Sequence, residues 1–214
     1  FYNMKDLSDF RISYDKSSLI EHQLPKEPIK LFQIWFEELC KSNSVIEPNA
    51  MTLSTVGNEN KPRNRVVLLK KFSEKGFVFY TNYKSKKGID INNNPNVSVS
   101  FFWPSFERQV IIEGICSKIT NKESDKYFYS RPIDSQIGAI ISDQSSEIPN
   151  RDYIENKFDS FKSDNTEIFR PLNWGGYIIN PINIEFWQGR KNRLHDRILY
   201  FKNNNSWLFK RLSP

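Results

Sequence analysis

Three basic or titratable side chains alternate along one short segment near the end of the chain, at Arg193, His195 and Arg197. In an extended strand, successive side chains point to opposite faces, so these three would share a face. Two guanidinium groups beside an imidazole form an anion-binding surface with one group that titrates near neutral pH. A solvated basic strand has the same pattern. Trp187 could offer its indole to a planar ring, although a strand tryptophan more often belongs to the core.

A second anion-binding pattern lies at Tyr127, Arg131 and Ser135, which are spaced four residues apart. Tyr127 and Arg131 would share a helix face. Pro132 suits the first turn of a following helix, which places Ser135 near the positive end of that helix. The three side chains would then converge on one anion, such as a phosphomonoester. An ordinary helix–proline–helix corner is the alternative.

Two further basic segments could hold phosphate. Arg65 and Lys70 lie on opposite faces of a predicted strand, so either a bulge intervenes or they hold different groups. Lys86 and Lys87 lie where a short helix is predicted to start, and backbone N–H groups at a helix start favour anions. Polar strand ends and a solvated loop are the alternatives.

Hydrophobic periodicity predicts the elements that must position these residues. Phe32, Trp35, Phe36 and Leu39 form one apolar helix face, and we expect Cys40 to be buried beside them. The predicted helices are Leu31–Lys41, Lys122–Ser130, Pro132–Ser142 and Arg151–Lys162. The predicted strands are Met51–Val56, Arg65–Phe72, Phe77–Thr81, Val97–Trp103, Gln109–Ile119, Gly176–Ile179, Ile184–Gln188, Leu194–Phe201 and Ser206–Leu212. This pattern predicts a mainly β fold, a closed or partly split barrel with peripheral helices.

Composition narrows the class of protein. The 214 residues carry a net charge of +6 and 14% aromatic residues, which fits one domain with a substantial core and a preference for anionic partners. Residues 1–25 read as an arm and 26–214 as the domain. Two distant cysteines without CxxC spacing argue against a metal site and a disulfide framework. No membrane span, signal peptide, GxGxxG or Walker pattern occurs, so a cytoplasmic protein is expected.

Taken in order, the motifs of this chain resemble those of the pyridoxine (pyridoxamine) 5′-phosphate oxidase family. The resemblance runs from about Arg11 to Pro214, and its specificity comes from the ordered set. The motifs are Arg-Val-Val-Leu-Leu-Lys at 65–70, Phe-Tyr-Thr-Asn at 79–82, Glu-Arg-Gln-Val at 107–110, Tyr-Phe-Tyr-Ser-Arg-Pro at 127–132, Asp-Ser-Gln-Ile-Gly-Ala at 134–139, Gln-Ser-Ser at 144–146, Glu-Phe-Trp-Gln-Gly at 185–189, Arg-Leu-His-Asp-Arg at 193–197 and Arg-Leu-Ser-Pro at 211–214.

The resemblance implies an FMN-binding split β-barrel that forms a homodimer, with FMN at the subunit interface. The implied FMN contacts are Arg65, Val66, Val67, Leu68, Leu69, Lys70, Tyr80, Thr81, Lys86, Lys87, Gln109, Gln144, Ser145, Trp187 and Arg197. The implied substrate contacts are Arg11, Tyr14, Lys70, Tyr127, Arg131, Ser135, Arg193 and His195. Residues 1–25, which include Arg11 and Tyr14, would serve as a lid over the substrate.

The implied activity is oxidation of pyridoxine 5′-phosphate or pyridoxamine 5′-phosphate to pyridoxal 5′-phosphate, with O2 reduced to hydrogen peroxide. Arg193 would orient the pyridine ring and His195 would hydrogen-bond near the reacting carbon, so both are the expected catalytic residues. Whether His195 takes a proton is left open. Lys86 stands where many members have Arg, which removes a planar fork from the phosphate site. Ser213 replaces a common Ala.

Two other functions fit parts of the pattern. A related split-barrel flavoprotein could act on another substrate, but it would have little reason to assemble Tyr127, Arg131 and Ser135. A basic barrel that binds nucleic acid would also be rich in positive charge and aromatic residues. Bound flavin would make the purified protein yellow, whereas salt-sensitive binding to single strands would favour the nucleic-acid reading.

Overall fold

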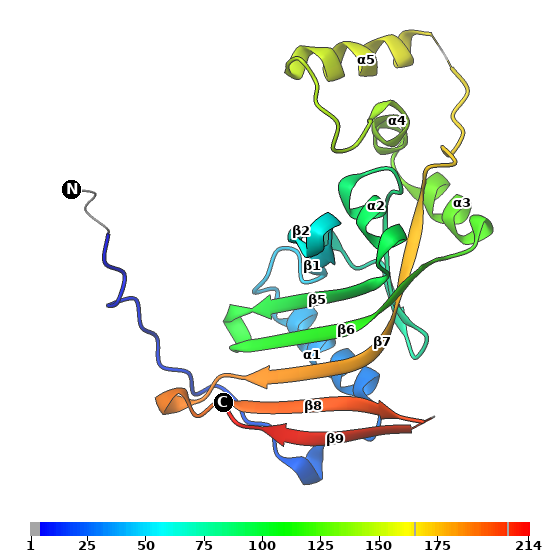
Figure 1. Ribbon diagram of the computed structural model, residues 1–214. Coiled ribbons are helices and arrows are strands. Elements are labelled where there is room, and N and C mark those ends of the chain that lie inside the picture. Colours follow the sequence, from blue (N-terminus) through cyan, green and yellow to red (C-terminus); the bar gives the residue numbers. More distant parts are fainter. Residues whose placement is uncertain (1–4, 165, 205) are drawn as a thin grey trace. The chain divides into compact units, whose positions relative to one another are not determined.

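The structure is a computed structural model, and it describes residues 5–164, 166–204 and 206–214 (Figure 1). Its strands form an antiparallel sheet in the order β2-β1-β5-β6-β7-β4-β3, with β8 paired to β7 and β9 paired to β8. The strands are β1 Ala50–Val56, β2 Pro62–Leu68, β3 Lys71–Ser73, β4 Gly76–Asn82, β5 Asn96–Trp103, β6 Arg108–Lys118, β7 Trp174–Gln188, β8 Asp196–Asn203 and β9 Ser206–Leu212. This mainly β architecture with an open sheet confirms the predicted fold class.

Helices occupy the connections between strands. The α-helices are α1 Pro28–Ser42, α2 Lys86–Asn93, α3 Asn121–Ser130, α4 Ile133–Ile141 and α5 Arg151–Ser163. Short 3₁₀ turns lie at η1 Glu21–Gln23, η2 Asn58–Asn60, η3 Pro104–Phe106 and η4 Lys191–Arg193. The described residues divide into two compact units, one formed by residues 5–48, 102–111, 183–204 and 206–214 and the other by 49–101, 112–164 and 166–182. Strands β5, β6 and β7 each continue from one unit into the other.

The first unit has its core between α1 and the strands β7 and β8. Trp35 and Leu39 are buried on α1, and the Trp35 ring meets Phe186 of β7 edge-on at 5.2 Å between ring centroids. Phe186 in turn packs against Tyr200 of β8 at 5.7 Å. The predicted apolar face of α1 is therefore confirmed. The prediction for Cys40 is wrong, because this residue lies just beyond the buried stripe and is exposed.

The core of the second unit includes buried side chains of the paired strands β4 and β7. These strands pair with Tyr80 opposite Gly176 and Phe79 opposite Tyr177. Phe79 and Tyr177 are both buried, and their rings stack at 5.7 Å. Gly176 has no side chain to obstruct the aromatic ring of Tyr80, since a Cβ there would lie 2.9 Å from a Tyr80 ring carbon.

Four predicted strands are divided, joined or shortened in the structure. The segment 65–72 is divided at Leu69 and Lys70, because the Leu69 N–H donates to the Asn49 carbonyl while the Lys70 N–H donates to the Val78 carbonyl. Arg65 and Lys70 therefore do not belong to one continuous strand, because the chain changes its strand partner between them. The segments 176–179 and 184–188 belong to one strand, β7. Residues 194 and 195 precede β8 and are not part of it.

Candidate active site

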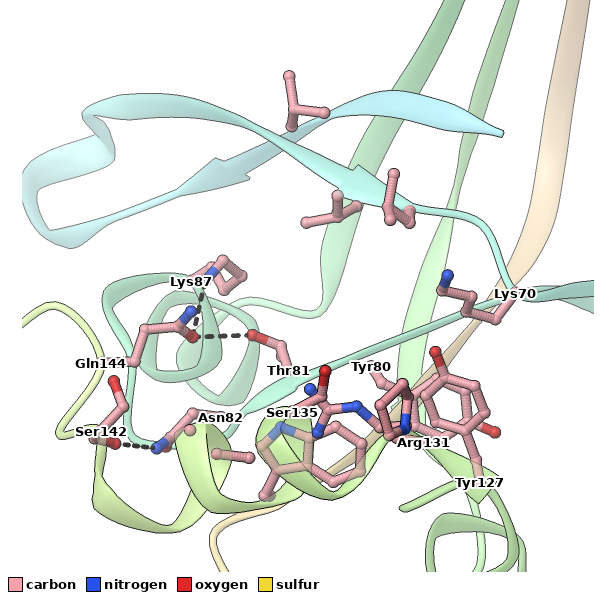
Figure 2. A pocket seen from close by; sticks show the side chains of 17 residues that line it. Lys70, Tyr80, Thr81, Asn82, Lys87, Tyr127, Arg131, Ser135, Ser142 and Gln144 are labelled. Carbon is pink, nitrogen blue, oxygen red and sulfur yellow. Dashed lines mark hydrogen bonds between the residues drawn. The ribbon is translucent and has the colours of Figure 1, made fainter. Parts of the chain in front are cut away.

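A cavity of about 670 Å³ lies in the second unit, between β4 and the helical segment α3–α4 (Figure 2). This volume is in the range typical of small-molecule and cofactor sites. The cavity is lined by Val66, Val67, Leu68, Lys70, Tyr80, Thr81, Asn82, Lys87, Tyr127, Arg131, Pro132, Ser135, Gly138, Ala139, Ser142, Gln144 and Trp174. Some of the predicted flavin contacts and some of the predicted substrate contacts therefore line the same cavity.

Three stacked aromatic rings form one wall of the cavity. Tyr80 on β4 stacks on Tyr127 of α3 with ring centroids 3.8 Å apart, and both rings are nearly parallel to Trp174 at the start of β7. The helix α3 that carries Tyr127 begins with a capping box between Thr120 and Glu123. This cap satisfies free N–H groups at the helix start, and so helps to hold Tyr127 in place.

Arg131 provides a half-buried cation beside this wall. It is the residue that ends α3, and its guanidinium carbon lies 4.8 Å from the centre of the Trp174 ring. Among the residues that the structure describes, its buried Nη1 atom has no hydrogen-bond partner, and the same is true of the Tyr80 hydroxyl. Burial lowers the pKa of Arg131 and raises that of Tyr80 to about 12. Unpaired buried donors are costly, so the site is suited to an anionic or acceptor-rich ligand.

A second polar group lies at the start of α2. Ser85 caps this helix, and its side chain accepts a hydrogen bond from the Gly88 N–H. The Gln144 Oε1 atom accepts hydrogen bonds from the Thr81 hydroxyl and from the Lys87 ammonium, both at 3.1 Å (Figure 2). Burial, and then the nearby charge of Arg65, lower the pKa of Lys87 to about 8. The helix start predicted from sequence is confirmed, and it holds a cation next to the cavity.

Arg65 does not line the cavity. Its Nη1 atom donates to the Thr55 hydroxyl at 2.7 Å and to the Leu53 carbonyl at 3.2 Å, and its Nη2 atom lies 3.9 Å from the buried Asp90 carboxylate. Three other flavin contacts expected in the second unit also lie outside the lining: Leu69, Lys86 and the exposed Ser145. Leu69 is buried in the core, and Lys86 is exposed, with its N–H donating to Ser145.

The remaining expected site residues lie in the first unit. Tyr14, Trp187 and His195 form an aromatic cluster there, with centroid distances of 4.7 Å from Trp187 to His195, 5.8 Å from Tyr14 to Trp187 and 6.0 Å from Tyr14 to His195. Gln109 is half-buried on β6. Arg11 is exposed, and its guanidinium bonds only locally, to the Ser8 carbonyl.

The prediction that Arg193, His195 and Arg197 share one strand face is wrong. Arg193 is in the 3₁₀ turn η4 with a left-handed φ of 60°, as is Asn192 with a φ of 59°. Of the three, only Arg197 lies in β8. Its guanidinium forms two bonds, of 2.7 and 3.0 Å, to the Glu185 carboxylate. The turn breaks the alternation of faces because its backbone is not extended.

Several cavity residues were not among the predicted site residues. Trp174 is the largest of them, and the others are Asn82, Pro132, Gly138, Ala139 and Ser142. Asn82 directly follows the Phe-Tyr-Thr run and donates to the Ser142 carbonyl at 3.4 Å. Because Asn82 directly follows the predicted contacts Tyr80 and Thr81, the sequence could have indicated that it is a site residue. Trp174 precedes two glycines at the start of a strand, and no neighbouring motif marks it as a site residue. Its place in the site depends on its contact with Arg131, which is distant in the sequence.

Two kinds of feature were not found in the part of the chain that the structure describes. No group of three or more His, Cys, Asp or Glu side chains there could hold a metal ion. Over the same residues, no helix is long and apolar enough to cross a membrane.

The fold and this cavity define a class, the split-barrel proteins of the flavin-binding type. A crystal structure of PhzG from Burkholderia lata 383, in complex with tetrahydrophenazine-1-carboxylic acid, superposes with a TM-score of 0.87 and 25% identity over 94% of this chain and all of that one. The fold also resembles a pyridoxamine 5′-phosphate oxidase-related, FMN-binding protein from Nostoc punctiforme, at a TM-score of 0.70 and 16% identity over 90% of this chain and 99% of that one.

The chain belongs to the pyridoxamine 5′-phosphate oxidase family. The family model matches residues 41–163, and the model of the pyridoxine 5′-phosphate oxidase C-terminal dimerisation region matches residues 174–214. A pyridoxine/pyridoxamine 5′-phosphate oxidase from Flavobacterium johnsoniae is 53% identical over 98% of this chain and its own full length. One from Leptospira biflexa is 47% identical over 99% of this chain and its own full length. These matches confirm the family inferred from the ordered motifs.

Proposed function

We propose that this protein is an FMN-dependent oxidase that converts pyridoxine 5′-phosphate or pyridoxamine 5′-phosphate to pyridoxal 5′-phosphate. The single observation that carries this proposal is the buried, unpartnered Nη1 atom of Arg131 at a cavity also lined by Tyr127 and Ser135. A phosphate group offers the several acceptor oxygens that these donors lack. The close relatives named for this activity support the same substrate class.

The proposed phosphate clamp consists of Lys70, Tyr127, Arg131 and Ser135, all of which line the cavity. Ser135 lies in the first turn of α4, where its N–H donates to the Pro132 carbonyl at 2.9 Å. The positive end of a helix favours an anion, and the guanidinium adds a fixed fork of donors. Binding energy from the phosphate would hold the reacting C4′ carbon in place, so the clamp would contribute to turnover as well as to affinity.

The residues fit FMN as the cofactor. The donors and cations around Lys87 suit a phosphate, the stacked rings suit a planar aromatic ligand, and the unpartnered Tyr80 hydroxyl can bond to either. The proposed contacts in the second unit are Arg65, Val66, Val67, Leu68, Leu69, Lys70, Tyr80, Thr81, Lys86, Lys87, Gln144 and Ser145. Arg65 would add positive charge near this phosphate, while its Nη1 atom already donates to Leu53 and Thr55.

The proposed flavin contacts in the first unit are Gln109, Trp187 and Arg197, and the proposed substrate contacts there are Arg11, Tyr14, Arg193 and His195. The 174–214 region matches a dimerisation region, which supports a homodimer. We place FMN at the interface of this homodimer. Residues 1–25 would close over the substrate as a lid.

FMN held by these residues would supply the redox chemistry, in which a hydride leaves C4′ of the substrate and O2 is finally reduced to hydrogen peroxide. Arg193 would orient the pyridine ring, because its guanidinium is exposed and its side chain forms no ion pair among the described residues. His195 would bond to a polar group of the substrate beside the reacting carbon. Positive side chains near the flavin would stabilise negative charge that develops on it.

Anaerobic mixing of the FMN-loaded protein with pyridoxine 5′-phosphate tests the activity. We expect the flavin absorbance to bleach in one turnover and to return when O2 is admitted. Protein that keeps its FMN but does not bleach would contradict the proposed activity. Arg193→Ala should bind FMN and lose bleaching, whereas Lys191→Ala, an equal loss of charge in the same turn, should bleach normally. Equal rates in the two variants would rule out the role of Arg193.

A further inference from the structure

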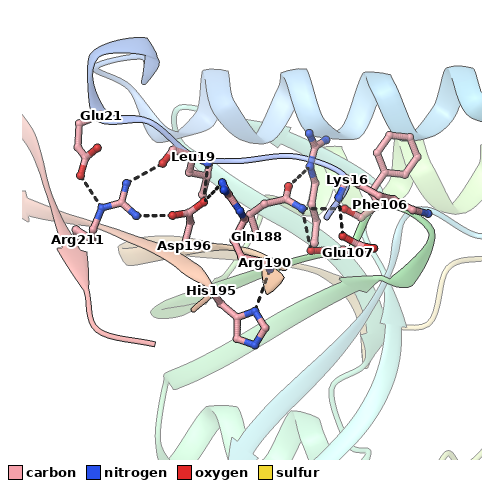
Figure 3. A network of polar contacts seen from close by, with 11 residues as sticks. Lys16, Leu19, Glu21, Phe106, Glu107, Gln188, Arg190, His195, Asp196 and Arg211 are labelled. Atoms are coloured by element: carbon pink, nitrogen blue, oxygen red, sulfur yellow. Dashed lines mark hydrogen bonds and ion pairs between the residues drawn. The ribbon is translucent and has the colours of Figure 1, made fainter. Parts of the chain in front are cut away.

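The His195 ring accepts a hydrogen bond from a neighbouring part of the main chain. The Arg190 backbone N–H donates to His195 Nδ1 at 3.1 Å (Figure 3). A ring nitrogen that accepts a hydrogen bond carries no proton, so the proton of the neutral ring is on Nε2. The aromatic contacts with Trp187 and Tyr14 restrict the ring further.

The Arg190 side chain forms a second link to the same segment, through Asp196. Its Nη1 atom bonds to Asp196 Oδ2 at 3.1 Å, and Asp196 directly follows His195. The Leu194 N–H also donates to the Lys191 carbonyl at 3.1 Å, which closes the turn between the two. Residue 190 is therefore joined to 195 through its backbone and to 196 through its side chain, so the Arg190 N–H is directed at the imidazole.

Asp196 is itself fixed by two further donors. Arg211 Nη1 lies 2.6 Å from Oδ1, and the Leu19 N–H donates to Oδ2 at 3.1 Å (Figure 3). Arg211 also bonds to Glu21 at 2.6 Å and to the Leu19 carbonyl at 2.7 Å. The Asp196 carboxylate is mostly buried, with 16% of its side chain exposed. A shielded carboxylate with three donors keeps its position better than an exposed one.

We infer that Arg190 and Asp196 are positioning residues that hold His195 in the Nε2–H tautomer, so that His195 donates a hydrogen bond to the substrate and does not take its proton. The identity of the substrate rests on the proposed function, but the tautomer does not. The C4′ hydroxyl of the alcohol substrate would then release its proton to another acceptor, such as water, when the hydride leaves the carbon.

The tautomer can be read directly, because the chain contains only two histidines, His22 and His195. The experiment uses the full-length, FMN-loaded protein labelled with ¹⁵N-histidine, and a spectrum that correlates ring protons with both ring nitrogens. His22→Gln removes the other signal, and His22 is exposed. We expect Nδ1 of His195 to resonate as an unprotonated nitrogen and Nε2 as a protonated one. The reverse pattern, or two averaged shifts, would overturn the inference.

Arg190→Ala and Asp196→Asn test the positioning role. Each should move the two nitrogen shifts of His195 toward each other, as a tautomer mixture does, and lower kcat about fivefold, the factor associated with one lost hydrogen bond. FMN content should not change. Lys191→Ala is the matched control, since the ion pair of the Lys191 side chain is with Asp15. Arg190→Lys should restore part of the wild-type pattern.

Unchanged shifts in both Asp196→Asn and Arg190→Ala would refute the positioning role. If Arg190→Ala does not fold, Asp196→Asn decides alone, because it keeps the size of the side chain and an acceptor for the Leu19 N–H. Failure of flavin bleaching together with the expected shifts would reject the proposed substrate and leave the tautomer in place, so the two failures can be told apart.

Discussion

The Arg131 guanidinium lies over the Trp174 ring, 4.8 Å from its centre, and this contact joins the end of α3 to the start of β7. Arg131 was expected from its motif, whereas Trp174 was not. A cation held on an aromatic face keeps its edge free for an anion. Its buried Nη1 atom, which has no partner among the described residues, can donate a hydrogen bond to a ligand.

Trp174→Leu should therefore raise the KM for pyridoxine 5′-phosphate by about five- to tenfold, the factor that corresponds to about 1 kcal/mol for a half-buried cation–π contact. Because the flavin chemistry does not involve Trp174 directly, kcat should fall less. Steady-state kinetics on the FMN-saturated protein measures both. Trp207→Leu removes another cation–aromatic pair, with Lys202 at 5.4 Å, and should leave KM unchanged. An equal rise in KM for both variants would refute the role of Trp174.

Lys87 should make FMN binding depend on pH. With a pKa of about 8, Lys87 is charged at neutral pH and loses its charge as the pH rises through that value. The affinity of the apo-protein for FMN should fall across that range. Fluorescence titration should show this step in the wild type and in Lys84→Gln, an equal charge loss at an exposed position, but not in Lys87→Gln. The same step in Lys87→Gln would assign it to another group.

The same pKa predicts the sign of a stability effect in the ligand-free protein. Below about 8, Lys87 is charged in both the folded and the unfolded chain, so it contributes no pH dependence. Between about 8 and the ordinary value of 10.5, only the unfolded chain holds the proton, and the contribution of Lys87 to the free energy of unfolding rises with pH. Urea unfolding of wild type and Lys87→Gln should differ by this slope, and parallel curves would contradict it.

Tyr80→Phe should affect stability and binding with opposite signs. The Tyr80 hydroxyl is buried without a partner, so its removal should stabilise the ligand-free protein by about 1 kcal/mol or leave it unchanged. Binding of FMN or substrate should weaken, because a donor is lost. Tyr200→Phe is the control: its hydroxyl donates to the Pro25 carbonyl at 2.9 Å, and its loss should destabilise by about 1 kcal/mol. Destabilisation by Tyr80→Phe would show that its hydroxyl has a partner in the ligand-free protein.

Arg170→Ala should destabilise the protein by about 2 kcal/mol, because it removes a buried side chain with several hydrogen bonds and leaves the Trp174 carbonyl without this donor. The Arg170 side chain is 5% exposed, and it bonds to Asp125 and Asn121 of α3 and to the Trp174 carbonyl. Arg151→Ala breaks an exposed pair with Glu155 on α5 and should cost less than about 0.5 kcal/mol. Denaturant unfolding compares the two, and similar losses would contradict the structural role of Arg170.

Local pattern predicted most elements, since helix and strand periods depend on neighbouring residues. The apolar face of α1 and the pairs of alternating strands around Pro104 and Gly76 needed no knowledge of the rest of the chain. The break at Leu69 and Lys70 could not be predicted in this way. It exists because the chain changes its hydrogen-bond partner there, from Asn49 to Val78. The turn at Asn192 and Arg193 likewise replaced a plausible alternation with a left-handed backbone.

The sequence by itself determined the family and most of the residues that line the cavity, because the chemistry of a motif is carried by residue types at short spacing. Only the tertiary structure decided which polar atoms of those residues are already occupied. Arg65 is bonded to Thr55 and Arg197 to Glu185, whereas Arg131 keeps a buried nitrogen without a partner. The reason is that burial and hydrogen-bond partners come from segments far apart in the chain, which no local pattern records.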